Sequence, residues 1–209
     1  MPIKLGIVPV TPYEQNCSIL VCQETGDAAV VDPGGDIEKI LAGVKQMGGN
    51  VKKILLTHGH LDHCAGAKDL ADQLGVPIEG PQEDERFWID QLPEQTVRFG
   101  FGHAKVFEPD RWLNNGDHVQ VGNVDLEVFH CPGHTPGHVV FFDKEDRLAI
   151  VGDVLFAGSI GRTDFPRGNH ADLINAIKTR LWPLGDDVQF VPGHGPMSTF
   201  GQERKTNPY

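Results

Sequence analysis

The sequence predicts a mixed α/β fold, and two patterns along the chain lead to this expectation. Short apolar runs with strand character alternate with segments whose apolar residues recur at helical intervals. The chain also divides into two halves, each with strands that lead to polar, ligand-type residues and with a later helix, although no residue-level repeat is visible. We expect residues 1–209 to form one domain, because 39% hydrophobic content can fill a core and no linker interrupts the chain.

Composition and charge exclude several classes of protein. The net charge of −11 argues against nucleic acid as a partner, because phosphate binding requires clustered Lys and Arg and no such run occurs. The N-terminus lacks an apolar signal region and no run is long enough to span a bilayer, so we expect a cytoplasmic protein that does not bind a membrane. Four dispersed cysteines agree with a reducing compartment and are interpreted as buried thiols: Cys17, Cys22, Cys64 and Cys131.

The first half of the chain is expected to contain strands within its first 31 residues and a helix near Ile37 to Met47. Lys53 to Thr57 reads as a buried strand, and Ala65 to Leu74 has apolar residues at helical intervals. Between them stands the run His58-Gly59-His60-Leu61-Asp62-His63, whose spacing does not match the i, i+4 pair of a helical metal site. We expect these six residues to lie on a loop, with a helix beginning near Cys64.

Three imidazoles and a carboxylate within six residues indicate a metal site, because imidazole is the commonest metal-binding side chain. The alternative is a solvated, His-rich loop that binds no metal. The helix expected near Cys64 favours the metal interpretation, since its N-terminal amides would stabilise the ionised form of Asp62. Loops at the carboxyl ends of strands are also where open α/β sheets place their chemistry.

A strand followed by a ligand-type residue recurs three times in the second half. Strand-like residues 124–129 lead to His134, residues 147–151 end at Gly152-Asp153, and residues 188–191 run into His194, which Gly and Pro flank on both sides. Each of these residues alone would more often be a helix cap or a hydrogen-bonded core residue. Their common placement after strands predicts that they complete the metal site begun at His58. A helix is expected near Ala171 to Thr179.

The segment Pro81 to Asn115 is irregular and rich in aromatic residues. We weigh two interpretations equally: its rings form a lip over the substrate, or they cover the edge of a sheet. The rings are Phe87, Trp88, Phe99, Phe101, Phe107 and Trp112.

The run Thr57 to His63, followed in order by His134, Asp153 and His194, resembles the metallo-β-lactamase superfamily over nearly the whole chain. The resemblance implies a four-layer αββα sandwich. It also implies that His58, His60 and His134 hold a first metal, that Asp62, His63 and His194 hold a second, and that Asp153 bridges the two. The cofactors implied are two divalent ions per chain; we expect Zn, with Fe or Mn as alternatives, because this donor set accepts all three.

The full His and Asp set, together with Gly158 to Pro166 and Glu203 to Pro208, resembles the glyoxalase II-like hydrolases, which act on hydroxyacylglutathione, and among them the short bacterial YcbL-type members. The loop that contains Arg162 is placed like the one that contacts glutathione in glyoxalase II, so Arg162 is a candidate for binding a substrate carboxylate. A salt bridge to Asp164 is the alternative. The helical C-terminal extension of full-length glyoxalase II, which supplies glutathione contacts, is not expected here.

These residues predict hydrolysis of a small-molecule thioester such as S-lactoylglutathione by a metal-bridging hydroxide. Two metals would lower the pKa of a shared water, which Asp62 is expected to orient as a catalytic residue. A thiol with a pKa of about 8.5 leaves without an acid catalyst, whereas an amide nitrogen does not. His138 is interpreted as a core histidine, with a role as metal-site partner or proton donor as the alternative. Cys64 and Cys131 are interpreted as packing residues rather than metal ligands.

Two other functions remain open. The first is a persulfide dioxygenase of the same fold, which the resemblance implies would use one iron held by residues matching His58, His134 and Asp153. The second is a metal-binding protein without turnover, which is disfavoured because a structural zinc site is closed by four ligands and this chain offers seven.

Overall fold

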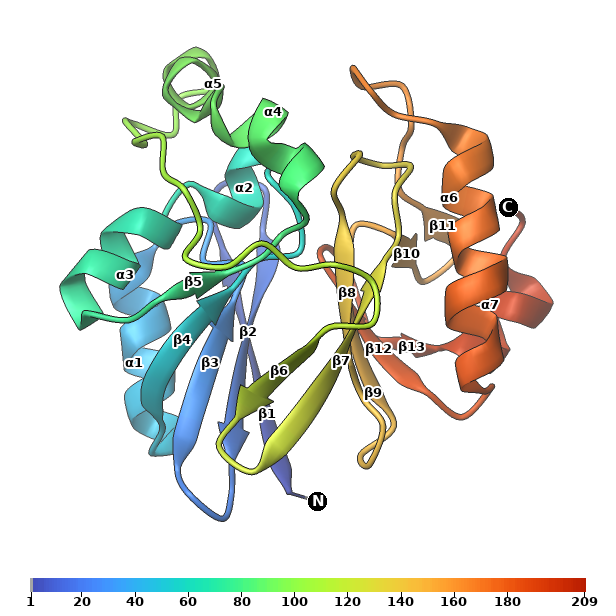
Figure 1. The fold of residues 1–209 in the computed structure, drawn as a ribbon, viewed down its shortest axis with the longest axis horizontal. Coiled ribbons are helices and arrows are strands. Elements are labelled where there is room, and N and C mark those ends of the chain that lie inside the picture. The colour runs from blue at the N-terminus through green and yellow to red at the C-terminus, as the bar shows by residue number, and fades with distance from the viewer. Residues whose placement is uncertain (1) are drawn as a thin grey trace.

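The structure, a computed structural model, describes residues 2–209 and contains two large β-sheets that face each other (Figure 1). The first sheet has five strands in the order in which they occur in the chain. Its first three strands pair antiparallel and the last three pair parallel. The strands are β1 (Ile3–Val10), β2 (Gln15–Cys22), β3 (Asp27–Val31), β4 (Asn50–Leu55) and β5 (Ile78–Glu79).

The second sheet has six strands in the order β13-β12-β9-β8-β7-β6. Only β9 and β12 run parallel; the other neighbours are antiparallel. Its strands are β6 (His118–Val121), β7 (Val124–His130), β8 (Val139–Asp143), β9 (Leu148–Gly152), β12 (Gln189–Pro192) and β13 (Ser198–Thr199). A small hairpin beside it comprises β10 (Leu155–Phe156) and β11 (Ser159–Ile160).

Both faces of the central strands are buried, which explains why these strands read as continuous apolar runs. In β8, Val139 and Phe141 belong to the hydrophobic layer between the sheets, whereas Val140 and Phe142 point to the opposite face. The layer between the sheets joins residues of the first sheet, such as Leu20, to residues of the second. This alternation follows from the two-residue period of a strand.

Helices cover the outer face of each sheet (Figure 1). The first sheet packs on α1 (Ile37–Met47) and α3 (Ala67–Leu74), both of which end at a glycine with positive φ. The second sheet packs on α6 (His170–Ala176), the π-helical turn η2 (Ile177–Leu181), the 3₁₀ turn η3 (Trp182–Leu184) and α7 (Phe200–Thr206). The predicted α/β class and its four-layer αββα arrangement are confirmed.

Two expectations about local structure are wrong. Only residues 58–60 of the histidine-rich run are loop, because α2 (Leu61–Cys64) begins three residues earlier than predicted and contains Asp62 and His63. The segment 81–115 is not irregular throughout. It contains the 3₁₀ turn η1 (Glu83–Glu85) and the helices α4 (Arg86–Ile89) and α5 (Leu92–Arg98).

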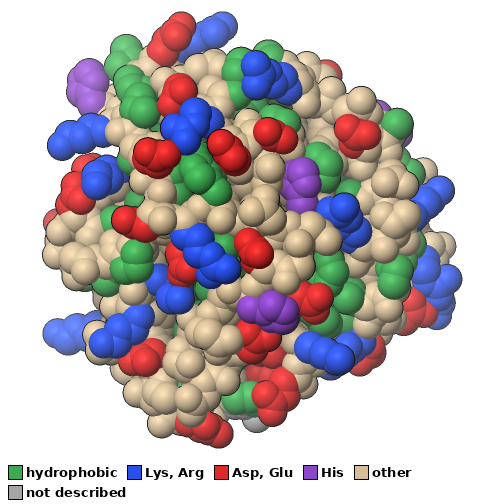
Figure 2. All heavy atoms as spheres, in the orientation of Figure 1, with side chains coloured by type: hydrophobic (Ala, Val, Ile, Leu, Met, Phe, Trp, Pro, Cys, Tyr) green, Lys and Arg blue, Asp and Glu red, His purple; other side chains and the backbone are tan. Residues whose placement is uncertain are grey.

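Among the helices of residues 2–209, none combines the length and the apolar character that a bilayer crossing requires. On the face drawn in Figure 2, Lys and Arg side chains are interspersed with Asp and Glu rather than gathered into one basic stretch. Phosphate-backbone binding would call for such a stretch.

Candidate metal centre

The predicted metal-binding residues lie on segments that follow strands of both sheets. His58 and His60 follow β4, and Asp62 and His63 lie on the short helix α2 immediately after them. From the second sheet, His134 follows β7, Asp153 follows β9 and His194 follows β12. Residues separated by up to 136 positions are thereby brought to one place.

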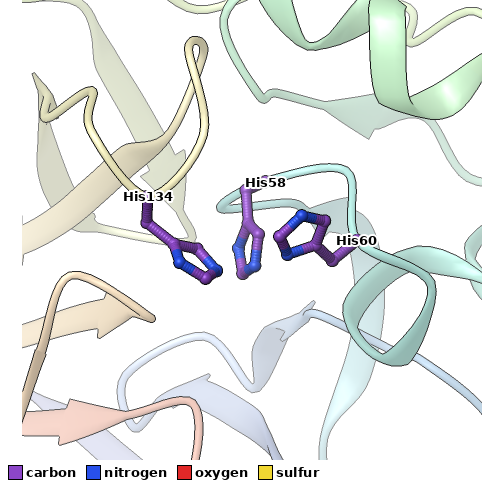
Figure 3. A group of neighbouring side chains, drawn as sticks. All are labelled: His58, His60 and His134. Carbon is purple, nitrogen blue, oxygen red and sulfur yellow. The ribbon is translucent and has the colours of Figure 1, made fainter. Parts of the chain in front are cut away.

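The first group of donors comprises His58, His60 and His134, each of which offers a ligand atom within 4.8 Å of the others. Figure 3 shows the three imidazoles around a common space, two from the loop after β4 and one from the facing loop after β7. The rings of His60 and His134 are perpendicular, with centroids 4.8 Å apart. Three convergent imidazoles match the donor set that a divalent transition metal prefers.

The second group comprises Asp62, His63 and His194, whose ligand atoms also lie within 4.8 Å of one another. Its shortest contact joins Asp62 Oδ2 to His194 Nε2 at 3.0 Å. Asp153 stands between the two groups, with its Oδ2 3.2 Å from His63 Nε2 and 3.5 Å from His134 Nε2. One carboxylate oxygen therefore reaches a member of each group, which is the geometry expected of a bridging ligand.

Asp32 is a central residue of the site that the sequence reasoning missed. Its Oδ2 accepts hydrogen bonds from His63 Nδ1 at 2.8 Å and from the Thr57 hydroxyl at 2.6 Å, and its Oδ1 accepts one from the Thr57 backbone N–H at 2.8 Å. The Thr57 oxygen in turn lies 2.9 Å from His58 Nδ1. Because Asp32 and Thr57 accept the Nδ1 protons, the Nε2 lone pairs of His63 and His58 are left free. Asp32 has a φ of 57°, and its position directly after a buried strand was the available signal.

Two further hydrogen bonds fix the second-sheet residues. His134 donates from Nδ1 to the backbone oxygen of Arg162 at 2.7 Å, which again leaves Nε2 free. His138 is fully buried and stacks on His58, and its Nε2 accepts the backbone N–H of Asp153 at 3.1 Å. His138 does not line the cavity over the site. It therefore holds the backbone of Asp153 from the side away from the cavity, and it is not placed to donate a proton to a substrate.

The two donor groups differ in their charge. Burial lowers the pKa of His60 to about 3 and lowers the pKa of His58 well below its usual value, so both are neutral near pH 7. Burial alone would lower the pKa of His63, but the carboxylates of Asp153 and Asp62 raise it well above its usual value. Burial opposes ionisation of Asp153, yet the neighbouring imidazoles, that of His63 foremost, hold its pKa well below the usual range. The second group therefore retains a proton that a cation would displace.

The buried polar atoms of the site fit metal ions. Within residues 2–209, several of them have no hydrogen-bond partner: Nε2 of His58, His60, His63 and His134, and Oδ1 of Asp153. Buried polar atoms are rarely left without a partner, so this concentration of unpartnered nitrogen and oxygen atoms needs a ligand. Imidazole nitrogens and carboxylate oxygens suit divalent zinc, iron or manganese, and the two groups are able to hold a dinuclear centre.

A cavity of about 970 Å³ opens over the donors. Trp88 of α4 and Phe165 lie edge-on to the His60 ring, with centroids 4.6 and 4.9 Å away. Helix α5 contributes Leu92 and Arg98 to the same wall. Part of the aromatic segment 81–115 thus lines the cavity over the site, while Phe107 and Trp112 pack into the core of the first sheet.

Arg162 also lines the cavity, where its guanidinium is exposed and forms a bidentate ion pair with Asp164 at 2.7 and 2.8 Å. The alternative weighed from the sequence, a salt bridge to Asp164, is therefore present. Cys64 and Cys131 are buried free thiols outside both donor groups. Burial raises the pKa of Cys131 to about 12, which agrees with a packing role.

Two clustered His/Asp donor groups at the strand ends of an αββα sandwich define a class of metal-dependent hydrolases. The chain belongs to this class as a member of the metallo-β-lactamase superfamily, whose family model matches residues 10–194. The predicted family is confirmed, and the chain is a metallo-hydrolase of that superfamily.

Individual relatives match over nearly their full length. The hydroxyacylglutathione hydrolase GloC of Haemophilus influenzae is 45% identical over 208 residues, covering 99% of this chain and 98% of the relative. The crystal structure of BLEG-1, a B3 metallo-β-lactamase, superposes with a TM-score of 0.89 at 33% identity and covers 98% of both chains. The crystal structure of TTHA1623 in a di-iron-bound form gives a TM-score of 0.87 at 33% identity, covering 97% of this chain and 98% of that one.

Proposed function

We propose that this protein hydrolyses thioesters of glutathione, with S-lactoylglutathione or a related acyl-glutathione as its small-molecule substrate. The observation that carries the proposal is the convergence of seven His and Asp side chains beneath an open cavity, which five of them line. The similarity to GloC, a hydroxyacylglutathione hydrolase, along the whole chain supports the substrate class. A thiolate leaves without an acid catalyst. This suits a cavity in which every buried titratable side chain is assigned as a metal donor, so that none is left to act as a general acid.

His58, His60 and His134 would hold one divalent ion, Asp62, His63 and His194 the other, and Asp153 would bridge them. Such a pair lowers the pKa of a shared water towards neutrality and polarises a carbonyl group. Asp62 is 7% exposed and lines the cavity. We therefore propose that it is the catalytic residue and that it orients the attacking water. Zinc is the ion we propose, with iron or manganese as alternatives; TTHA1623 is a relative seen with two irons.

Arg162 is proposed to bind a carboxylate of the glutathione moiety. It stands at the cavity rim, and its present partner Asp164 is itself exposed, so a substrate carboxylate could replace Asp164 at small cost. We further propose a cytoplasmic location, in keeping with four free cysteines, and no nucleic-acid or membrane partner.

The proposal is tested by elemental analysis of the purified protein together with turnover of S-lactoylglutathione with and without oxygen. Two metals per chain and equal anaerobic and aerobic rates are expected. Asp62→Asn should lower kcat by about 100-fold or more, because general-base positioning is worth that much. The matched control Asp72→Asn, on the exposed surface of α3, should leave kcat unchanged. A single iron with oxygen consumption on glutathione persulfide would instead identify a dioxygenase, and turnover of a β-lactam alone would identify a lactamase.

A further inference from the structure

Glu85 is a buried carboxylate that the metal centre does not use as a donor. It is the last residue of η1, directly before α4, and its side chain is fully buried. No Lys, Arg or His of residues 2–209 lies within ion-pair distance of it. A carboxylate taken out of water in this way is costly unless several hydrogen bonds replace its hydration.

The hydrogen bonds of Glu85 come from the two loops that carry the first donor group. Oε2 accepts the backbone N–H of Gly59 at 2.7 Å, and Gly59 lies between His58 and His60. Oε1 accepts the backbone N–H of Gly137 at 2.8 Å, in the loop between β7 and β8 that also contains His134. Each carboxylate oxygen thus accepts a hydrogen bond from one loop. Hydrogen bonds to a carboxylate are stronger than hydrogen bonds between two neutral groups.

The backbone is shaped to admit this carboxylate. A Cβ at Gly137 would lie 2.6 Å from the Glu85 backbone nitrogen and 2.7 Å from its Cγ, and a Cβ at Gly59 would lie 3.0 Å from Oε2. Glycine is therefore required at Gly137 and favoured at Gly59 for the three segments to meet. A second link, from the Gln82 N–H to the Gly137 oxygen at 3.0 Å, ties the start of η1 to the same loop.

These contacts place Glu85 between the loop of His60 and the loop of His134, whose separation has to be fixed if both residues are to bind one ion. His60 follows the first sheet and His134 follows the second, and an ion bound by both requires their separation to be kept to a few tenths of an ångström. Three residues after Glu85, Trp88 packs edge-on to His60, so the same anchor also fixes one wall of the cavity.

We propose that Glu85 is a positioning residue that sets the spacing between the His58–His60 loop and the His134 loop, and thereby the affinity of the first metal site. Glu85 does not touch the second group, Asp62, His63 and His194. Its effect is therefore selective for one of the two ions. The inference rests on the metal centre of the proposed function and is independent of the substrate on which that centre acts.

The test uses Glu85→Gln, which keeps the size of the side chain but turns an NH₂ group towards one of the two backbone N–H donors. Two backgrounds separate the ions: His194→Ala removes a donor of the second group, and His60→Ala removes a donor of the first. Zn²⁺ dissociation constants are measured by competition with a chelator in each background. Glu85→Gln should weaken Zn²⁺ binding by about tenfold or more with His194→Ala, the usual effect of losing an outer partner, and by less than about threefold with His60→Ala.

Asp143→Asn is the matched control, because Asp143 is also a buried carboxylate that accepts two backbone N–H bonds, but its partners are Glu145 and Asp146 rather than a metal loop. It should change neither constant. Equal weakening in both backgrounds, or a lower melting temperature with unchanged Zn²⁺ binding, would reduce Glu85 to a structural residue and overturn the inference. If the protein with the natural sequence binds two Zn²⁺ ions but does not hydrolyse thioesters, the proposed reaction fails while the role of Glu85 stands.

Discussion

Asp32 controls imidazoles of both donor groups through a single carboxylate. It accepts directly from His63, a member of the second group, and it acts on His58 of the first through the Thr57 hydroxyl. Its hydrogen bonds to His63 and Thr57 explain why it is an orienting residue rather than a ligand, although one of its oxygens lies within 4.8 Å of ring nitrogens of His58 and His63. Orientation of metal-binding histidines by such outer partners raises their basicity and fixes their tautomer.

At the same scale, Asp143 makes stability depend on pH. Its Oδ1 accepts the N–H groups of Glu145 and Asp146, whereas its buried Oδ2 has no partner within residues 2–209. Burial raises the pKa of Asp143 to about 6. Because the folded-state pKa lies above the unfolded value near 4, the native state binds the proton more tightly, and the free energy of unfolding falls as pH rises from about 4 to 6.

Asp143→Asn should remove this pH-dependent loss of stability, because the amide of asparagine does not ionise. Relative to the parent protein, the variant should gain stability between pH 4 and 6 and remain about 1–2 kcal/mol more stable at pH 7. Denaturant unfolding at pH 4.5, 5.5 and 7 with a chelator present measures the difference. The exposed-site variant Asp72→Asn is the control, and a constant gap across this range would show that Asp143 is already ionised at pH 4.5.

At the scale of elements, the turn after β3 and the short helix α2 approach each other backbone to backbone. A Cβ at Gly34 would collide with the backbone oxygen of Asp62, the second residue of α2. The Cβ of an alanine at Gly66 would likewise lie 2.6 Å from the backbone oxygen of Pro33. The position of Asp62 and His63 therefore depends on two glycines that bind nothing themselves.

Gly34→Ala is expected to push α2 away from the turn. It should cost at least about 1–3 kcal/mol of stability and weaken the second Zn²⁺ site, because Asp62 and His63 move with the helix. The neighbouring Gly35→Ala is the control: its Cβ would meet only the Thr11 side chain, at 3.1 Å, and should cost under about 1 kcal/mol. Urea unfolding of the metal-free proteins and Zn²⁺ titration compare the two; indistinguishable variants would contradict the argument.

The elements that sequence reasoning placed correctly are those with a long periodic signal. The helix Ile37–Met47 was predicted at its observed bounds because its apolar residues recur at helical spacing and Gly48 ends it. Helices α4 and α5 were missed because they have only four and seven residues, too few for a clear periodic signal. Such short helices are stabilised by packing over the site, as Trp88 on His60 shows, and not by local propensity.

For the whole molecule, the metal centre would add a further link between two halves that already meet in the layer between the sheets and through hydrogen bonds such as those of Glu85. Four of the seven donors follow the first sheet and three follow the second: His58, His60, Asp62 and His63, then His134, Asp153 and His194. Bound ions would also offset part of the net charge of −11. Metal binding is therefore expected to stabilise the folded chain against separation of its halves.

This expectation is tested by comparing the melting temperature of the protein in the presence of Zn²⁺ with its melting temperature in the presence of a chelator. Free Zn²⁺ at about 100 times its dissociation constant adds about 2.7 kcal/mol per site, or about 5–10 °C for a chain of this size. Carboxylate neighbours raise the pKa of His63 and His194 above 6.5, so protons compete with the ion at and below neutral pH. The thermal shift should be largest at pH 8 and shrink steadily towards pH 6; a shift that does not change with pH would refute this.

The sequence by itself determined the donor types, their order along the chain and their placement after strands, because strand and helix periods are local properties that a single segment encodes. Residues His58 and His134 could be marked as candidates on that basis alone. Only the tertiary structure decided which donors lie within reach of one another, that Asp32 orients two of them and that Glu85 ties two of their loops together. Those contacts join segments far apart in the chain, and their distances depend on how two sheets and their covering helices pack, which no local pattern specifies.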